Sequence, residues 1–138
     1  MEQKKTPKDY EVFFHVTPRC EKSAKKSRHH VSHSLEKIKL VLKQYPEYGT
    51  VIPGHNKLRK MRVAVPGMGK SGGYRLIYRK TEGEEIIYIT FLEVYFKGYI
   101  SDLSNDEYRI LTAESEEVLK NILEIDWEKQ APPEDDNR

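Results

Sequence analysis

The feature that most limits the fold of this chain is an almost uninterrupted apolar run between Glu85 and Tyr95. Its aliphatic and aromatic members are Ile86, Ile87, Tyr88, Ile89, Phe91, Leu92 and Val94. A strand with one solvated face alternates apolar and polar residues, whereas a strand covered on both faces reads as a continuous apolar run. The run therefore predicts a central, buried strand of a sheet.

Two further strands are predicted before it. Between Leu58 and Val65 the side chains alternate, so that one face is mostly basic and the other mostly apolar. The first face carries Leu58, Lys60, Arg62 and Ala64, and the second carries Arg59, Met61, Val63 and Val65. The next strand is Gly73–Arg79, joined to the central one by a turn at 82–84. This pattern is typical of a sheet with one wet face.

The N-terminal part of the chain is expected to supply a strand and two helices. A short strand at Tyr10–Val16 precedes a weakly periodic, helical stretch at Arg19–His33. The second helix is expected to begin at an N-cap on Ser34 and to end before Pro46. Its apolar face holds Leu35, Ile38, Leu42 and Tyr45.

The remaining segments complete the expected order of elements. Glycine and proline residues in Tyr48–Lys57 predict a loop. A final helix is expected from Asp106 to about Ile125, capped by Ser104 or Asn105. The sequence thus predicts an α/β (α+β) fold in the order β-αα-βββ-α, with a mainly antiparallel sheet. We expect one domain over residues 9–126, a flexible N-terminus at 1–8 and a disordered acidic tail at 127–138.

Charge is distributed unevenly along the chain. Residues 50–81 contain eight Lys or Arg and no Asp or Glu, although the formal net charge of the protein is only +2. Residues 114–138 contain nine acidic residues and three basic ones. A basic block of this kind is the footprint of a surface that meets phosphate. The alternative is that the basic strands are solvated faces and the acidic end aids solubility.

Several classes of protein are disfavoured by composition. No run of 18 apolar residues exists, so no membrane span is expected. The first ten residues lack the apolar core of a secretory signal. Cys20 is the only cysteine, so no internal disulfide forms, and the chain fits a reducing cytoplasm. We expect no metal site: His29, His30 and His33 are better explained as a surface helix face.

The glycine-rich connection after Val65 contains part of a phosphate-binding loop. Gly69, Lys70 and Ser71 form the G-K-S of that motif. The complete motif needs a glycine at position 64, where Ala64 stands, and it must open a helix. Here a predicted strand follows instead. A nucleotide-hydrolase loop is therefore disfavoured.

Two motifs carry a resemblance to a known family. Leu58 to Tyr78 reads L-R-K-M-R-V-A-V-P-G-M-G-K-S-G-G-Y-R-L-I-Y, and Val94 to Ser104 reads V-Y-F-K-G-Y-I-S-D-L-S. Both resemble the RelE superfamily of toxin–antitoxin toxins, and in particular its HigB-type branch. The similarity extends from about Tyr10 to Leu123. It implies a RelE-like toxin domain with the helices packed on one face of the sheet.

The resemblance also implies a function. Members are small endoribonucleases that cleave messenger RNA, usually in the ribosomal A site, and a cognate antitoxin neutralises them, expected here to be a small helix-turn-helix DNA-binding protein. The ribose 2′-OH attacks the adjacent phosphate, and neither a metal nor another cofactor is required. Two alternatives stay open: a weakened or inactive homologue that binds RNA or the ribosome, and a protein-interaction domain whose basic groove holds an acidic partner.

The family motifs match particular residues of this chain. The catalytic candidates are Lys60, Arg62, Arg75, Tyr95 and Lys97. The candidates for gripping the RNA backbone are Lys57, Arg59, Lys70 and Arg79. Lysine and arginine would hold phosphate and stabilise the phosphorane charge, and a tyrosine would stack a base or donate a proton. Arg59 has an alternative, since strand alternation turns it away from the face of Lys60 and Arg62.

Two positions depart from the family pattern. Gly98 stands where many relatives keep a basic or amide residue, and Ser104 stands where some keep a stacking aromatic. Tyr99 and Tyr108 are the candidates to replace that aromatic. These departures are the reason that an inactive homologue stays open as the alternative to the enzyme.

Overall fold

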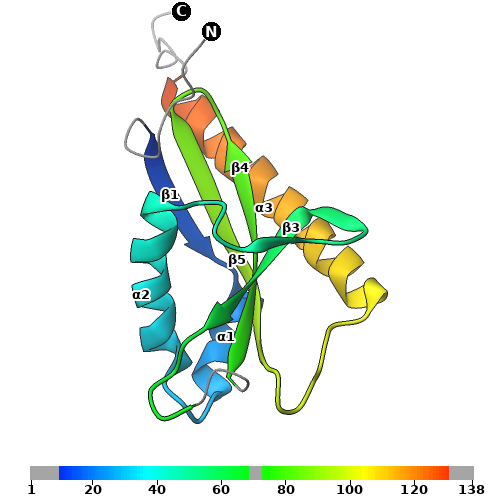
Figure 1. The fold of residues 1–138 in the computed structure, drawn as a ribbon. Coiled ribbons are helices and arrows are strands. Elements are labelled where there is room, and N and C mark those ends of the chain that lie inside the picture. Colours follow the sequence, from blue (N-terminus) through cyan, green and yellow to red (C-terminus); the bar gives the residue numbers. More distant parts are fainter. Residues whose placement is uncertain (1–9, 69–72, 131–138) are drawn as a thin grey trace, which may run out of the picture.

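The computed structural model describes residues 10–68 and 73–130, which form one five-stranded sheet with helices on both sides (Figure 1). The order of the strands is β1-β5-β4-β3-β2. Their bounds are β1 Glu11–Val16, β2 Thr50–Ile52, β3 His55–Val63, β4 Tyr74–Glu82 and β5 Ile86–Phe96. β1 pairs with β5 in parallel, and every other pair is antiparallel. The predicted α+β class and mainly antiparallel sheet are confirmed.

The apolar run that predicted a central strand forms β5. This strand lies between β1 and β4, and Ile89, Phe91 and Leu92 are fully buried. Its side chains enter two separate apolar clusters, one on each face of the sheet. Both faces therefore need a cover, and the three helices supply it.

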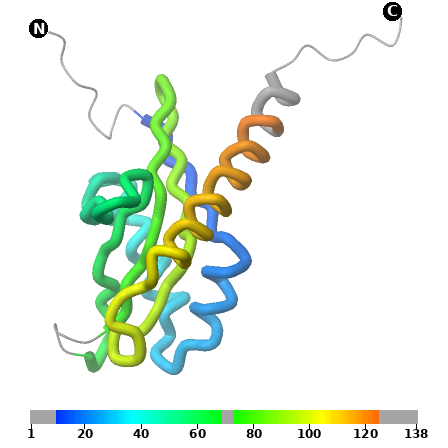
Figure 2. The backbone as a smooth tube through the Cα atoms, turned by 90° about the vertical axis from the view of Figure 1, so that its right-hand side faces the viewer, coloured from blue at the N-terminus to red at the C-terminus, as the bar shows by residue number. Residues whose placement is uncertain are grey.

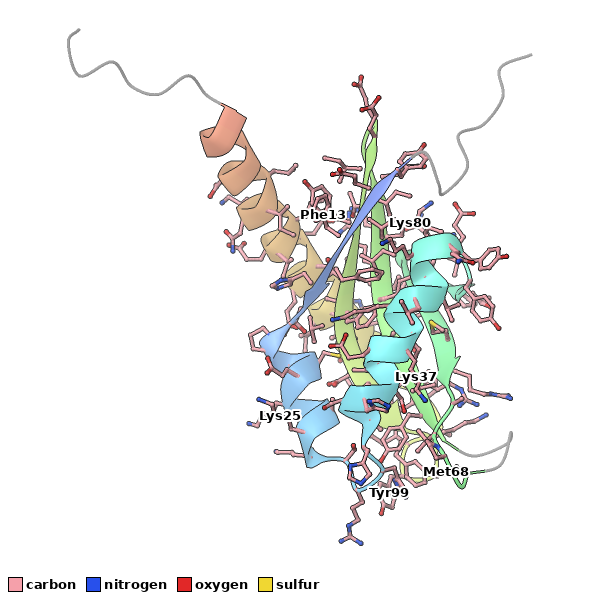
Figure 3. All side chains as sticks on the ribbon, turned by 90° about the vertical axis from the view of Figure 1, so that its left-hand side faces the viewer. Phe13, Lys25, Lys37, Met68, Lys80 and Tyr99 are labelled. Carbon is pink, nitrogen blue, oxygen red and sulfur yellow. The ribbon has the colours of Figure 1, made fainter. Side chains whose placement is uncertain are left out.

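The helices do not share one face, which corrects the expectation from the resemblance. Helices α1 (Pro18–Lys26) and α2 (Val31–Gln44) pack on the face that carries Met61, Val63 and Leu76. Figure 3 views the molecule from this side, with both helices in front of the sheet. Helix α3 (Asn105–Gln130) packs on the opposite face, where Figure 2 shows it crossing the strands at an angle. The reason is the continuous apolar run of β5, which leaves apolar surface on both sides.

The second cluster shows how α3 is attached. Leu58, Ile77 and Leu92 lie under Tyr108 and Leu111 of α3. All five side chains are almost completely buried. Only the first part of the helix makes this contact, since its far end extends beyond the sheet (Figure 2).

The N-terminal helices begin and end at other residues than expected. The hydroxyl of Thr17 caps α1 by accepting from the Cys20 amide at 3.2 Å. Ser27 then ends α1, so the expected helix over 19–33 is divided in two. The cap of α2 is His30, which adopts a left-handed conformation with φ of 55°, and Ser34 is buried inside the helix. Serine is common at helix N-caps, which is why the sequence favours Ser34 there, but the structure buries this serine inside α2.

Two other boundaries also differ from the sequence-based expectations. The expected loop at 48–57 contains the short strand β2 and the start of β3. The expected cap at Ser104 is present as a reciprocal pair, because the Glu107 amide donates to its hydroxyl and its own amide donates to the Glu107 carboxylate, both at 3.1 Å. Helix α3 continues to Gln130, past the expected end at Ile125 and past residue 126.

Residues 1–9 and 131–138, and with them most of the expected flexible ends, lie outside the described residues. Within the described part of the chain, no helix is long and apolar enough to cross a membrane.

Candidate functional site

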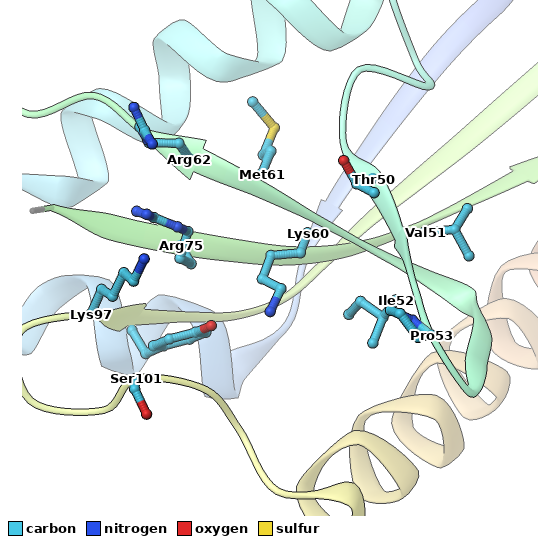
Figure 4. Close-up of a pocket in the computed structure, with 11 residues that line it drawn as sticks. Thr50, Val51, Ile52, Pro53, Lys60, Met61, Arg62, Arg75, Lys97 and Ser101 are labelled. Atoms are coloured by element: carbon cyan, nitrogen blue, oxygen red, sulfur yellow. The ribbon is translucent and has the colours of Figure 1, made fainter. Parts of the chain in front are cut away.

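The α3 side of the sheet is divided into two halves. In the covered half, α3 lies over Leu58, Ile77 and Leu92. In the open half, toward the other end of β3, β4 and β5, the face is hollowed into a pocket of about 340 Å³ (Figure 4). The pocket is lined by Thr50, Val51, Ile52, Pro53, Lys60, Met61, Arg62, Arg75, Tyr95, Lys97 and Ser101.

Strand register brings the five catalytic candidates together in this pocket. Lys60 and Arg62 are two residues apart on β3 and therefore share a face. Arg62 is paired with Arg75 on β4, and Arg75 is paired with Tyr95 on β5. Lys97 follows β5 directly and completes the set. The predicted proximity of these residues is thus observed, whereas their chemical roles stay a prediction.

Three of the pocket cations have no acidic partner in the part of the chain that the structure describes. Among the described residues, no carboxylate lies within ion-pair distance of Arg62, Arg75 or Lys97. Arg75 is only 9% exposed, and one of its guanidinium nitrogens donates to the Tyr74 carbonyl at 3.2 Å. Figure 4 shows these three side chains at one end of the pocket and the β2 residues at the other. Cations gathered without counter-charges repel one another, so the arrangement favours an anionic ligand.

Lys60, the fourth cation, is paired. Its Nζ lies 3.0 Å from Oδ1 of Asp102 and 5.9 Å from the centre of the Tyr108 ring. The same Asp102 oxygen accepts from the Tyr108 hydroxyl at 2.5 Å and from the Leu103 amide at 2.8 Å. Burial alone would raise the pKa of Asp102, but the hydrogen bonds from Tyr108, Lys60 and the amide outweigh it and lower the pKa. Asp102 is therefore ionised at neutral pH.

Tyr95 places a hydroxyl group in the pocket wall. The side chain is 6% exposed, and its hydroxyl oxygen is buried without a hydrogen-bond partner among the described residues. Burial raises the pKa of Tyr95, and the nearby positive charge of Lys60 partly opposes the rise. The phenol is therefore protonated at neutral pH, and the Tyr108 hydroxyl is its polar neighbour.

The three RNA-gripping candidates that the structure describes, Lys57, Arg59 and Arg79, do not line the pocket. Lys57 and Arg79 both pair with Glu116 of α3, at 2.6 and 2.9 Å. Arg59 lies on the other face, as strand alternation predicts, where it donates to the carbonyls of Glu47 and Gly49 rather than to a helix carboxylate. Lys70 lies outside the described residues.

Gly98 and Ser104, the two departures from the family pattern, each have a structural reason. A Cβ at position 98 would come within 2.3 Å of the Phe96 ring. That ring is held between Tyr74, His29 and Tyr99, with centroid separations of 5.2, 5.8 and 4.8 Å. Ser104 is needed to cap α3. Neither position is therefore explained by loss of function alone.

The rings of the two candidate replacements are also placed. Tyr108 is buried, with its ring 5.0 Å from that of His55 and its hydroxyl on Asp102. Tyr99 is 81% exposed at the turn after β5 and packs against Phe96 on the α1/α2 side. Tyr99 has a free surface for stacking, whereas Tyr108 has none.

Sequence reasoning missed Asp102 and the β2 wall of the pocket, and it named Tyr108 as a stacking aromatic and not as a partner of Asp102. The D-L-S of the second motif contains Asp102, but an aspartate just before a helix is ordinarily explained as a turn or cap residue. Residues 50–53 were expected to form a loop. Only the pairing of β2 with β3 places Thr50–Pro53 beside Lys60.

The histidines near residue 30 and the single cysteine have structural roles in this fold. His29 is hydrogen-bonded to the Tyr74 hydroxyl at 3.0 Å, and His30 begins α2, so the three histidines do not share one helix face. The described residues contain no group of three His, Cys, Asp or Glu able to hold a metal ion. Burial, with a smaller effect from Glu93, raises the pKa of Cys20 to about 12, which disfavours thiolate chemistry.

Comparisons with known proteins return a structural likeness. No family model matches this chain. The structure is similar to that of an arginine-to-alanine double mutant of the Escherichia coli toxin RelE in the free state, with 20% sequence identity and a TM-score of 0.46. The match covers 64% of this chain and 86% of the RelE chain.

Proposed function

We propose that this protein is an endoribonuclease toxin of the RelE type that cleaves messenger RNA on the ribosome. The observation that carries the proposal is the convergence of Lys60, Arg62, Arg75, Tyr95 and Lys97 in one pocket. Three of these side chains are cations without an acidic partner among the described residues. A phosphodiester is the anion that a basic groove with an adjacent hydroxyl donor would accept.

The chemistry proposed for this pocket transfers protons without an oxidant or a co-reactant. The ribose 2′-OH loses its proton and its oxygen bonds to the adjacent phosphorus, while the bond from phosphorus to the 5′-oxygen breaks. The 5′-oxygen takes up a proton, leaving a 2′,3′-cyclic phosphate on one fragment and a 5′-hydroxyl on the other. Arg62, Arg75 and Lys97 would stabilise the extra charge of the phosphorane.

Lys60 and Tyr95 are the candidates for the two proton transfers. Tyr95 lines the pocket with a phenol that is protonated at neutral pH, so it is the candidate to protonate the leaving oxygen, a role that requires RNA binding to uncover its buried hydroxyl. Lys60 lies on the neighbouring part of the wall and would assist the 2′-OH. Lys57, Lys70 and Arg79 are retained as proposed contacts to the RNA backbone, whereas Arg59 is not, because it lies on the other face of the sheet. For Lys57 and Arg79, such a contact would replace Glu116.

The alternative of an inactive RNA-binding homologue loses part of its support. It rested on Gly98 and Ser104, and both residues have a packing or capping role in this fold. The antitoxin proposed for this chain is a small helix-turn-helix protein. A gene for such a protein beside this one would support the pairing.

The experiment that tests the proposal is cleavage of a synthetic messenger with and without ribosomes. The wild-type protein is expected to release a fragment ending in a 2′,3′-cyclic phosphate when ribosomes are present. Arg75→Ala is expected to lower the rate about 100- to 1,000-fold, the usual cost of removing one charge-stabilising donor. The matched control is Arg109→Ala, since Arg109 lies on the exposed surface of α3. Binding of the messenger without cleavage would instead establish the inactive homologue.

A further inference from the structure

Asp102 is an acidic residue that contacts the pocket lining and has no part in the proposed mechanism. It lies between β5 and α3, and its Oδ1 accepts three hydrogen bonds. Two of the donors, the Leu103 amide and the Tyr108 hydroxyl, belong to the segment that leads into and forms α3. The third donor is Lys60, which belongs to β3. The carboxylate is therefore held by α3 and in turn holds a pocket residue.

Lys60 differs from the other pocket cations of the described structure in being held by a carboxylate. A lysine side chain has four rotatable bonds, and about 2 kcal/mol of rotamer entropy opposes its fixation. Within the described structure, Asp102 is the only carboxylate that pairs with Lys60, whose side chain is 29% exposed. The Tyr108 ring lies beside the same ammonium group, 5.9 Å from it. Lys60 is thus held at one place on the wall, whereas Arg62 and Lys97 have no such tether.

The geometry points to Asp102 as the positioning residue of the pocket: α3 fixes the carboxylate through Tyr108, and the carboxylate fixes the Lys60 ammonium. This role rests on the proposed function, in which Lys60 serves the reacting ribose. Asp102 does not itself line the pocket, so it acts on the reaction through Lys60, which it holds directly, and through its charge, which adds to the effect of burial and raises the pKa of Tyr95. A fixed ammonium would shorten the search for the reactive geometry, and displacement of a catalytic group by about 1 Å can cost about 100-fold in rate.

The opposite role for the same contact is competition. If the Asp102 carboxylate competed with RNA phosphate for the Lys60 ammonium, removing the carboxylate would free Lys60 and tighten RNA binding. The positioning role predicts that binding stays nearly unchanged and that the rate of cleavage falls. The two roles therefore differ in the sign of the effect on affinity.

The test is a double-mutant cycle between Asp102→Asn and Lys60→Ala, read by single-turnover cleavage on ribosomes. Asp102→Asn is expected to lower the cleavage rate about 10- to 100-fold. In the Lys60→Ala background it is expected to change the rate at least about fivefold less, because the positioning effect passes through Lys60 and only the charge effect on Tyr95 is left. Asp106→Asn is the matched control, since it removes an exposed carboxylate from the first turn of α3. Equal losses in both backgrounds would show a merely structural role and overturn the inference.

Two readouts do not require cleavage. Binding of a 2′-O-methyl RNA, which lacks the attacking hydroxyl, is expected to change less than about threefold in Asp102→Asn, and clearly tighter binding would overturn the positioning role. The ammonium group of Lys60, observed by ¹⁵N NMR, is expected to give a slowly exchanging signal that Asp102→Asn abolishes and Tyr108→Phe weakens. An unchanged signal would also overturn the inference. If the wild type cuts no RNA but the signal behaves as expected, the proposed function fails and the tether remains.

Discussion

The two halves of the α3-facing side of the sheet are made by the same three strands but treat their charges differently. In the covered half, Lys57 and Arg79 share Glu116 of α3. In the open half, Arg62, Arg75 and Lys97 have no carboxylate partner among the described residues. The basic block of the sequence is therefore divided by α3 into two groups. Lys57 and Arg79 pair with the helix, whereas the pocket cations are available to an anionic ligand.

Lys60 lies at the boundary between the halves. It lines the pocket, yet it is paired with Asp102, which is itself bound to Tyr108 of α3. The comparison teaches that the position of α3 decides which basic residues are available to a ligand. Each of the following predictions would break or sharpen that distinction.

The largest effect is expected from shortening a buried apolar side chain in the covered half. Leu58 is fully buried under α3, so Leu58→Ala removes apolar contacts and leaves a cavity. We expect a loss of about 2–5 kcal/mol in the free energy of unfolding, measured by urea titration. RNA affinity of the protein that remains folded should stay near the wild-type value. A loss of affinity as large as the loss of stability would contradict the separation of the two halves.

A smaller loss is expected at the turn that borders the open half. If Gly98 only marks a lost functional group, a side chain there should be harmless or should strengthen RNA binding. The contact with the Phe96 ring predicts instead that Gly98→Ala lowers stability by about 1–3 kcal/mol, the usual cost of overpacking. Thermal unfolding of this variant beside Gly54→Ala, where a Cβ would meet nothing within 4 Å but φ is positive, separates the clash from backbone strain.

The pocket cations are expected to control the salt dependence of RNA binding. Each phosphate contact contributes about 0.7 to the slope of log K against log salt for single strands. Arg62→Ala and Lys97→Ala should each lower that slope by about this amount. The control Lys25→Ala removes a cation from α1, on the other side of the sheet, and should leave the slope unchanged (Figure 3). If Arg62→Ala and Lys97→Ala kept the wild-type slope, as Lys25→Ala is expected to do, RNA would bind away from the pocket.

The smallest effect concerns pH and the covered half. Hydrogen bonds from Lys57 and then Arg79 lower the pKa of Glu116 below its ordinary value of 4.5. Because the folded pKa is the lower one, the stabilising contribution is present above the unfolded pKa and is lost as the pH falls through the folded pKa. Glu116 is half-exposed, so the contribution is below about 1 kcal/mol. Urea titrations between about pH 5 and pH 3 should show a steeper loss for the wild type than for Glu116→Gln.

Much of the fold could be predicted because local patterns were strong. The continuous run at 86–94 identified β5, and alternation at 58–65 separated Lys60 and Arg62 from Arg59 correctly. The predicted cap of α2 was wrong. Ser34 has the side chain typical of a cap, whereas His30 reaches the cap position only through a left-handed backbone. Local composition does not encode that difference.

The sequence by itself determined four of the five described strands, the two motifs and the face that Lys60 and Arg62 share, because these depend on spacing along one chain segment. Only the tertiary structure decided which cations are neutralised, since Glu116 and Asp102 reach them from α3 and the segment before it. It also decided that Arg75, Tyr95 and Lys97 meet Lys60 and Arg62, because strand register joins segments that are distant in sequence. Charge along a chain is local information, whereas charge left without a partner is a property of packing.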